Sequence, residues 1–138
     1  MTDLEGKWQY QSFRPEPIAL SVGVAKPPFE AWSSVGDVTI DAGSKSGTLT
    51  FSPPPIAITL ALTLTVTDGD PESVSISAVG ALPNGAPFTN TLHGWLVPLD
   101  PSKPIATDNP AVIRGSIVQT SAAATPKFTT GFFVIKRV

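Results

Sequence analysis

Few residues in this sequence are of the types that carry out catalysis. His93 is the single histidine, and the chain contains no cysteine and no GxSxG segment that would place a serine nucleophile on a sharp turn. A Ser-His-Asp triad would have to use His93 without such a turn, so the sequence does not predict one. Because histidine and cysteine are the usual ligands of zinc, iron and copper, we expect no metal and no cofactor.

Two other segments carry ion-binding residue types. Asp68, Asp70 and Glu72 form an acidic cluster, but their spacing differs from that of an EF-hand and is typical of a turn. Residues 43–47, Gly-Ser-Lys-Ser-Gly, lie between predicted strands and lack the following helix of a phosphate-binding loop. Both segments are therefore predicted to be connections between strands.

The aromatic residues are more informative about binding. Trp8 and Tyr10 are two residues apart, and His93 and Trp95 share this spacing. Side chains two apart lie on the same face of a strand. In a small barrel, inward aromatic residues either fill the interior or line a ligand cavity, and both interpretations stay open. In the second, Trp8, Tyr10 and Trp95 form the walls. His93 and Arg114 then supply orienting hydrogen bonds, although the inward face of the strand around His93 is not defined.

Period-two alternation of apolar and polar residues predicts β-strands throughout the chain. It is clearest over residues 56–67, where even positions are Ile, Leu or Val and odd positions are Ala or Thr. Pro, Gly, Asn and Asp separate the alternating segments, as is usual for turns. The segments predicted as strands are 4–11, 37–41, 48–52, 56–67, 73–78, 87–97, 111–120 and 128–137. Residues 14–34 are rich in proline and are left unassigned.

About eight strands joined by hairpins indicate a single all-β domain over residues 1–138. Two architectures fit, a single antiparallel up-and-down β-barrel and, as the alternative, a two-sheet β-sandwich. The apolar last strand favours the barrel, because closure pairs it with the first strand and removes both exposed edges.

The charge of the chain excludes several classes of partner. Its 9 Lys+Arg and 11 Asp+Glu give a net charge of -2 without a basic stripe, so we expect no nucleic acid and no membrane as a partner. The odd positions of residues 57–67 carry no charge. They predict either a wall of good β-forming residues or a contact between copies in a homo-oligomer. The first residues lack the features of a secretory signal, so we expect a cytoplasmic protein.

The segment Gly6-Lys7-Trp8, followed by a meander that closes on an apolar last strand, resembles the calycin barrels, the lipocalins and avidins, whose first strand carries Gly-x-Trp. The lipocalin resemblance implies a basic residue near the last strand packed over that Trp, with Arg137 or Arg114 as candidates. The avidin pattern has Asn where this chain has Tyr10, so biotin binding is not implied. Residues 93–98 and 112–118 also resemble small uncharacterised bacterial β-domains, some attached to oxidoreductases, which imply no activity of their own.

Three functions fit these observations. The leading prediction is a homo-oligomeric barrel that binds a small apolar or aromatic molecule in its lumen and catalyses nothing. The first alternative is a structural or interaction domain that docks on a partner enzyme through an apolar wall. The second is a barrel cyclase or isomerase that acts by shape, with His93, Tyr10 or Arg114 as acid, base or anion stabiliser.

Overall fold

Nine strands make up most of the part of the chain that is described. The computed structural model describes residues 2–15, 29–31, 35–51, 58–122 and 126–138. The strands are β1 (Gly6–Pro15), β2 (Phe29–Ala31), β3 (Gly36–Ile40), β4 (Ser46–Phe51), β5 (Thr59–Thr67), β6 (Ser73–Ala81), β7 (Pro87–Pro98), β8 (Ala111–Gln119) and β9 (Thr130–Arg137). No helix within these ranges is long and apolar enough to cross a membrane.

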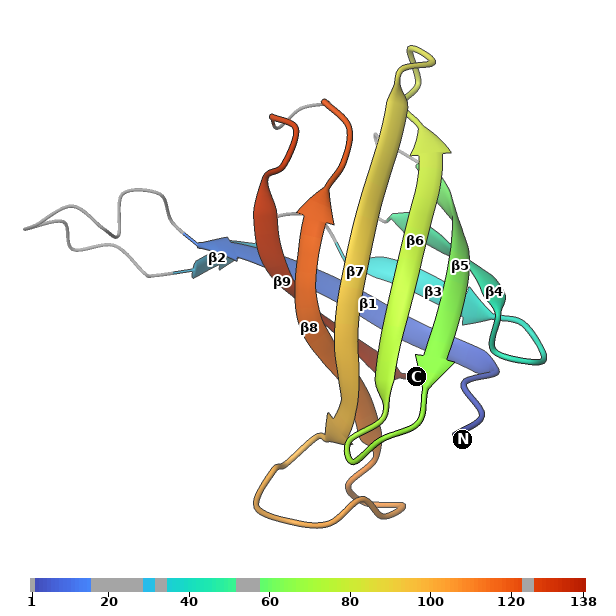
Figure 1. Cartoon of the computed structure of the whole chain (residues 1–138), viewed down its shortest axis with the longest axis vertical. Helices are drawn as coiled ribbons and strands as arrows, with labels where there is room; N and C mark the ends of the chain where they lie inside the picture. Colours follow the sequence, from blue (N-terminus) through green and yellow to red (C-terminus); the bar gives the residue numbers. More distant parts are fainter. Residues whose placement is uncertain (1, 16–28, 32–34, 52–57, 123–125) are drawn as a thin grey trace, which may run out of the picture.

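The strands close into a barrel. Each strand from β3 to β9 pairs antiparallel with the next along the chain, and β1 pairs with both β3 and β9. The eight strands β1 and β3–β9 therefore form the predicted up-and-down barrel (Figure 1). The alternative of a two-sheet sandwich is wrong, because the β1–β9 pairing completes the ring. β2 pairs with the end of β1 and stands beside the ring.

The predicted strands agree with those of the structure apart from their ends. β1 continues to Pro15, four residues beyond the predicted end at Gln11. β2 comes from the segment that the sequence left unassigned. Residues 52, 56 and 57, which were predicted to be in strands, lie outside the described residues.

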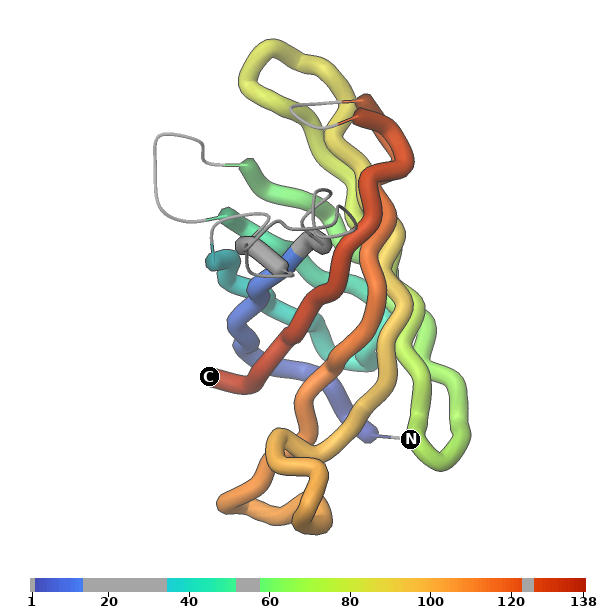
Figure 2. The backbone as a smooth tube through the Cα atoms, turned by 90° about the vertical axis from the view of Figure 1, so that its left-hand side faces the viewer, coloured from blue at the N-terminus to red at the C-terminus, as the bar shows by residue number. Residues whose placement is uncertain are grey.

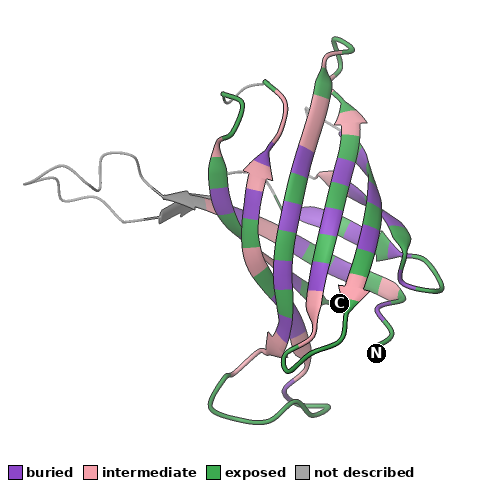
Figure 3. Ribbon diagram, in the orientation of Figure 1, coloured by how far each residue is buried: buried purple, intermediate pink, exposed green. Residues whose placement is uncertain are grey.

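Alternation along each strand separates the interior from the surface. On β5 the even positions Leu60, Leu62 and Leu64 are buried, whereas the threonines and the alanine between them are exposed. The same alternation appears as stripes across the barrel wall (Figure 3). Because period-two spacing sends neighbouring side chains to opposite faces, this pattern assigns each strand position to the interior or to the outer wall.

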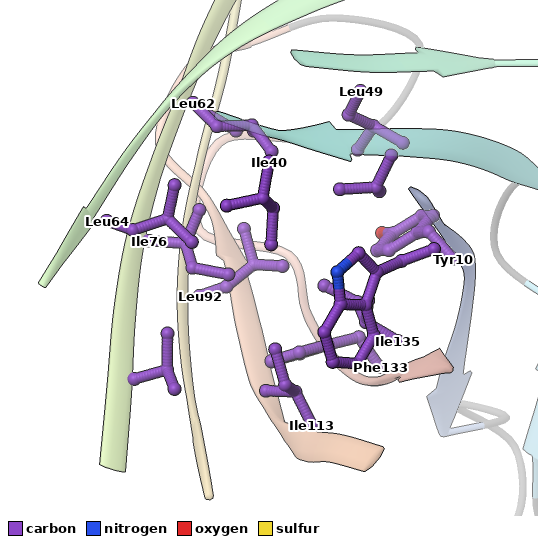
Figure 4. Close-up of a cluster of buried hydrophobic side chains, with 14 of the residues drawn as sticks. Tyr10, Ile40, Leu49, Leu62, Leu64, Ile76, Leu92, Ile113, Phe133 and Ile135 are labelled. Atoms are coloured by element: carbon purple, nitrogen blue, oxygen red, sulfur yellow. The ribbon is translucent and has the colours of Figure 1, made fainter. Parts of the chain in front are cut away.

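The interior is packed with hydrophobic side chains from every strand of the ring, aromatic on β1 and mostly aliphatic on the other strands. Ile40, Leu64, Ile76 and Leu92 approach one another from four different strands (Figure 4). A methyl group built on Gly94 would meet the Phe133 ring at 2.9 Å. The aromatic ring of Phe133 therefore packs at this position because residue 94 has no side chain.

The two ends of the barrel are distinguished by the segments they hold. The lower end is the end at which β1 begins and β9 ends, near both termini (Figures 1 and 2). The upper end is the end at which a hairpin joins β6 and β7. That hairpin turns at Asn84-Gly85 as predicted, with Gly85 at a φ of 84°. The acidic segment around Asp68 is a connection at the lower end, also as predicted.

Candidate functional site

The five residues predicted to bind a ligand fall into two groups. Trp8 and Tyr10 point into the barrel and are 1% and 2% exposed. His93 and Trp95 point outward, because Leu92, Gly94 and Leu96 occupy the inward positions of β7. Arg114 also points outward, between Ile113 and Gly115 on β8. The geometry therefore does not support a ligand site in the lumen that is formed by all five residues.

The predicted acid, base and anion stabiliser are also separated by the barrel wall. Tyr10 lies inside, whereas His93 and Arg114 lie outside. A cyclase or isomerase that used the three together would need them on one side of the sheet. The geometry does not favour that interpretation.

Trp8 closes the lower end of the barrel. Its Nε1 donates a hydrogen bond to the carbonyl oxygen of Leu4 at 2.9 Å. The guanidinium of Arg137 lies 4.2 Å from the centroid of the Trp8 ring and donates to the carbonyl oxygens of Glu5 and Asp3 at 2.9 and 2.8 Å. Of the two basic residues implied by the calycin resemblance, Arg137 occupies this place. Arg114 instead donates to Leu99 O on the outer surface at 3.2 Å.

Three aromatic rings cross the interior toward the upper end. Tyr10 and Phe51 meet edge to face at 5.9 Å between ring centroids, and Phe51 meets Phe88 in the same way at 6.2 Å. The rings come from β1, β4 and β7, and β4 and β7 are not neighbours in the sheet, so the second contact spans the interior. Neither Phe51 nor Phe88 was predicted to bind a ligand. Their inward orientation could have been found from the period-two pattern, because Phe51 lies an even number of positions from Leu49 and Phe88 an even number from Leu92.

Polar side chains replace aliphatic ones among the inward positions near the upper end. Ser12, Asn90 and Gln119 are buried, at 1%, 5% and 2% exposed. Asn90 and Gln119 are paired across β7 and β8, and Ala78 is the partner of Asn90 on β6. The Nε2 of Gln119 donates to Ser121 O at 2.6 Å, which fixes this amide to the chain.

The carboxamide of Asn90 is different, because no residue in the described ranges hydrogen-bonds it. Within the same ranges every fully enclosed side-chain nitrogen or oxygen has a hydrogen-bond partner. Since the Asn90 side chain is only 5% exposed and has no such partner, its amide atoms must still be partly accessible. Accessible amide atoms can hydrogen-bond to water or to a bound molecule, so this position is available to a ligand group that both donates and accepts.

The outward group forms what we call the aromatic wall, made of His93, Trp95, Arg114 and Phe132. Trp95 and Phe132 are 42% and 48% exposed. His93 packs edge to face on Trp95 at 5.1 Å, and its Nδ1 lies 3.0 Å from the hydroxyl of Ser75. No carboxylate in the described part of the chain bonds to His93, so Ser75 and His93 do not extend to a triad.

A groove of about 600 Å³ lies at the lower end, between the start of the chain, the β3–β4 turn and β5. It is open and of mixed character, with Asp3, Lys45 and Thr65 among its lining residues. Next to Thr2, two hydrogen bonds from the hydroxyl and backbone N–H of that residue lower the pKa of the Glu72 carboxyl. No group of three His, Asp or Glu residues in the described ranges is arranged to hold a metal ion. The described lining of the groove therefore indicates no particular reaction and no particular ion.

Comparison with models of known protein families, with curated protein sequences and with solved structures finds no match to this chain. The closed eight-stranded antiparallel barrel is compatible with a calycin-like fold. The candidate site at the upper end accordingly depends on its own geometry.

Proposed function

We propose that this protein is a calycin-like barrel that binds a small apolar or aromatic molecule at the upper end of its interior, without catalysing a reaction. The observation that carries the proposal is the Asn90 carboxamide, which is 5% exposed and has no hydrogen-bond partner among the described residues. A buried amide of this kind is expected where a ligand supplies the missing partner.

The surroundings of Asn90 support the same proposal. Ligand sites are mostly apolar and aromatic, with a few polar groups that fix orientation. Phe88 lies two positions from Asn90 on the same face of β7, and its contact with Phe51 continues to Tyr10. The lower end lacks this combination, because Trp8 and Arg137 are engaged with each other and with the chain.

The neutral fluorescent probe N-phenyl-1-naphthylamine tests the proposal. We expect its emission to rise on addition of the protein, because the probe enters an apolar site. Phe88→Leu should weaken binding about two- to twelvefold, since an aromatic contact contributes about 0.5–1.5 kcal/mol. Trp95→Ala, which changes an aromatic residue of the outer wall, serves as the matched control and should leave the affinity unchanged. No rise in emission, or a rise lost in Trp95→Ala and kept in Phe88→Leu, would contradict the proposal.

A second candidate function rests on the outer wall of β5 and β6, where no described residue is charged. We call this surface the uncharged wall; its outward residues are Thr59, Ala61, Thr63, Thr65, Thr67, Ser73, Ser75, Ser77, Val79 and Ala81. Exposed sheets of monomers usually carry Lys or Glu. We propose that this wall contacts a second copy of the chain, because two such walls can meet without burying a charge.

Light scattering at high micromolar concentration tests this contact. We expect a particle heavier than the 14.4 kDa chain, and a 14.4 kDa particle for Thr63→Glu, which places a charge in the wall. Gln9→Glu, at an exposed outward position of β1, is the control and should not change the mass. A wild-type particle of 14.4 kDa would contradict the contact.

A further inference from the structure

We infer that the molecule bound at the upper end is a neutral ring compound that carries an adjacent hydrogen-bond donor and acceptor, of the amide or lactam class. The inference rests on the proposed function, because it specifies the ligand of the same site. It follows from the chemistry of Asn90, from the absence of charge on the described inward positions, and from the neighbours of Asn90 in the sheet.

The side chain of Asn90 can both donate and accept hydrogen bonds. A carboxamide offers a carbonyl oxygen that accepts and an NH₂ group that donates, held in one plane. Both are satisfied at once by a group that presents a donor next to an acceptor, as an amide or lactam does. A carboxylate would satisfy only the NH₂ group, and an alkyl chain would satisfy neither.

The described inward positions around Asn90 carry no charge. Between Arg137 at the lower end and Asn90 near the upper end, the inward-facing positions that the structure describes are apolar, glycine or uncharged polar residues. A buried ion without a partner is strongly disfavoured. An anionic or cationic group of a ligand would therefore have no described counter-charge beside Asn90.

The neighbours of the amide in the sheet are small, fixed or aromatic. Its neighbour across β6 is Ala78, whose side chain is small and fully buried in the core. Its neighbour across β8 is Gln119, which is held by Ser121. The aromatic ring of Phe88 lies two positions along the same face. A flat ring with a polar edge fits such surroundings better than a flexible chain does.

The competing arrangement is an anionic group held at the rim. Lys127 lies on the β8–β9 connection at the upper end, with its Nζ 4.9 Å from the centroid of the exposed Phe128 ring. Both residues are exposed, so an anion there would remain in water, where an ion pair contributes little. The inward amide is therefore the more selective group.

Three compounds with one ring system separate these possibilities: naphthalene-2-carboxamide, naphthalene-2-carboxylate and 2-methylnaphthalene, each used to displace N-phenyl-1-naphthylamine. We expect the carboxamide to bind about tenfold tighter than 2-methylnaphthalene, which corresponds to two ordinary hydrogen bonds. The carboxylate should bind at least tenfold more weakly than the carboxamide.

Asn90→Leu keeps the size of the side chain and removes its hydrogen bonds. In this variant the carboxamide should lose about tenfold in affinity, whereas 2-methylnaphthalene should bind as before, which also shows that the variant is folded. If none of the three compounds binds the wild-type protein, the proposed function itself fails. If they bind equally, or if the carboxylate binds best and loses its affinity in Lys127→Gln, the site stands and the inference on ligand class is overturned.

Discussion

The lower and upper ends of the barrel each hold a buried asparagine, and the two are bonded in opposite ways. Asn109, in the β7–β8 loop of the lower end, is 4% exposed. Its Oδ1 accepts from Asp100 N at 2.8 Å, and its Nδ2 lies within 3.1 Å of the carbonyl oxygens of Asp100, Lys103 and Pro104. Asn90, at the upper end, is 5% exposed and makes no such bond with any described residue.

The two asparagines differ in whether the chain itself satisfies a buried carboxamide. A buried amide is stable when the chain satisfies it, as at Asn109. At Asn90 the chain supplies no such bond, and under the proposed function a ligand supplies it. Under the proposed function, the lower end therefore keeps its buried amide bonded within the chain, whereas the upper end leaves one amide for a ligand.

Trp8→Ala should have the largest effect on stability. Removing a fully buried Trp costs about 3–5 kcal/mol, because the aliphatic core cannot refill the space. Urea unfolding of the variant measures this loss. Trp95→Ala removes the same side chain from the aromatic wall and should cost within about 1 kcal/mol. Equal losses for the two variants would break the distinction between the lower end and the outer wall.

Asn109→Ala should have the next largest effect. It removes the hydrogen bonds that hold the β7–β8 loop, each with a net value of about 0.5–1.5 kcal/mol, so we expect a loss of about 2–4 kcal/mol in the free energy of unfolding. The neighbouring Asp108 is exposed, and Asp108→Ala should change stability by less than about 0.5 kcal/mol. A loss below 1 kcal/mol for Asn109→Ala would show that the loop does not depend on this amide.

Arg137→Gln should cost less, about 1–2 kcal/mol, because it removes hydrogen bonds and a cation–π contact at an exposed position. Chemical unfolding provides the measurement. Lys136→Gln removes a charge from the next residue, which is also exposed, and should leave stability unchanged. Equal behaviour of the two variants would mean that Arg137 does not cap Trp8.

Asn90→Leu should have the smallest effect on stability. Since the amide has no described partner to lose, the free energy of unfolding should stay the same or rise by up to about 1 kcal/mol. Urea unfolding without ligand tests this directly against Asn109→Ala. A loss of 2 kcal/mol or more would place Asn90 with Asn109 among the structural residues.

The fold was largely predictable from local pattern, whereas the site was not. Period-two alternation determines strands because a strand has only two faces, and the hairpin turns then determine the order in which strands pair. On β7 both faces contain large apolar residues, Leu92 on one and Trp95 on the other, so alternation could not tell which face lies inside. The closed ring of strands determines which face of β7 lies inside.

Asn90 could not be recognised from the sequence for a related reason. It lies between Thr89 and Thr91, in a run of polar residues that signals no inward face. Its contribution depends on neighbours far along the chain, such as Gln119 and Ala78, which only the sheet register brings beside it. The partner of Trp8 was better defined, since Arg137 was one of two candidates that the calycin resemblance implied.

The side-chain amide resonances of the two asparagines test the central claim most directly. On titration with naphthalene-2-carboxamide, a ¹⁵N–¹H correlation spectrum should show the Nδ2 protons of Asn90 shifting in a saturable manner while those of Asn109 stay in place. Saturable shifts at the Trp95 indole, with Asn90 unchanged, would put the ligand on the outer wall and contradict a binding site at the upper end.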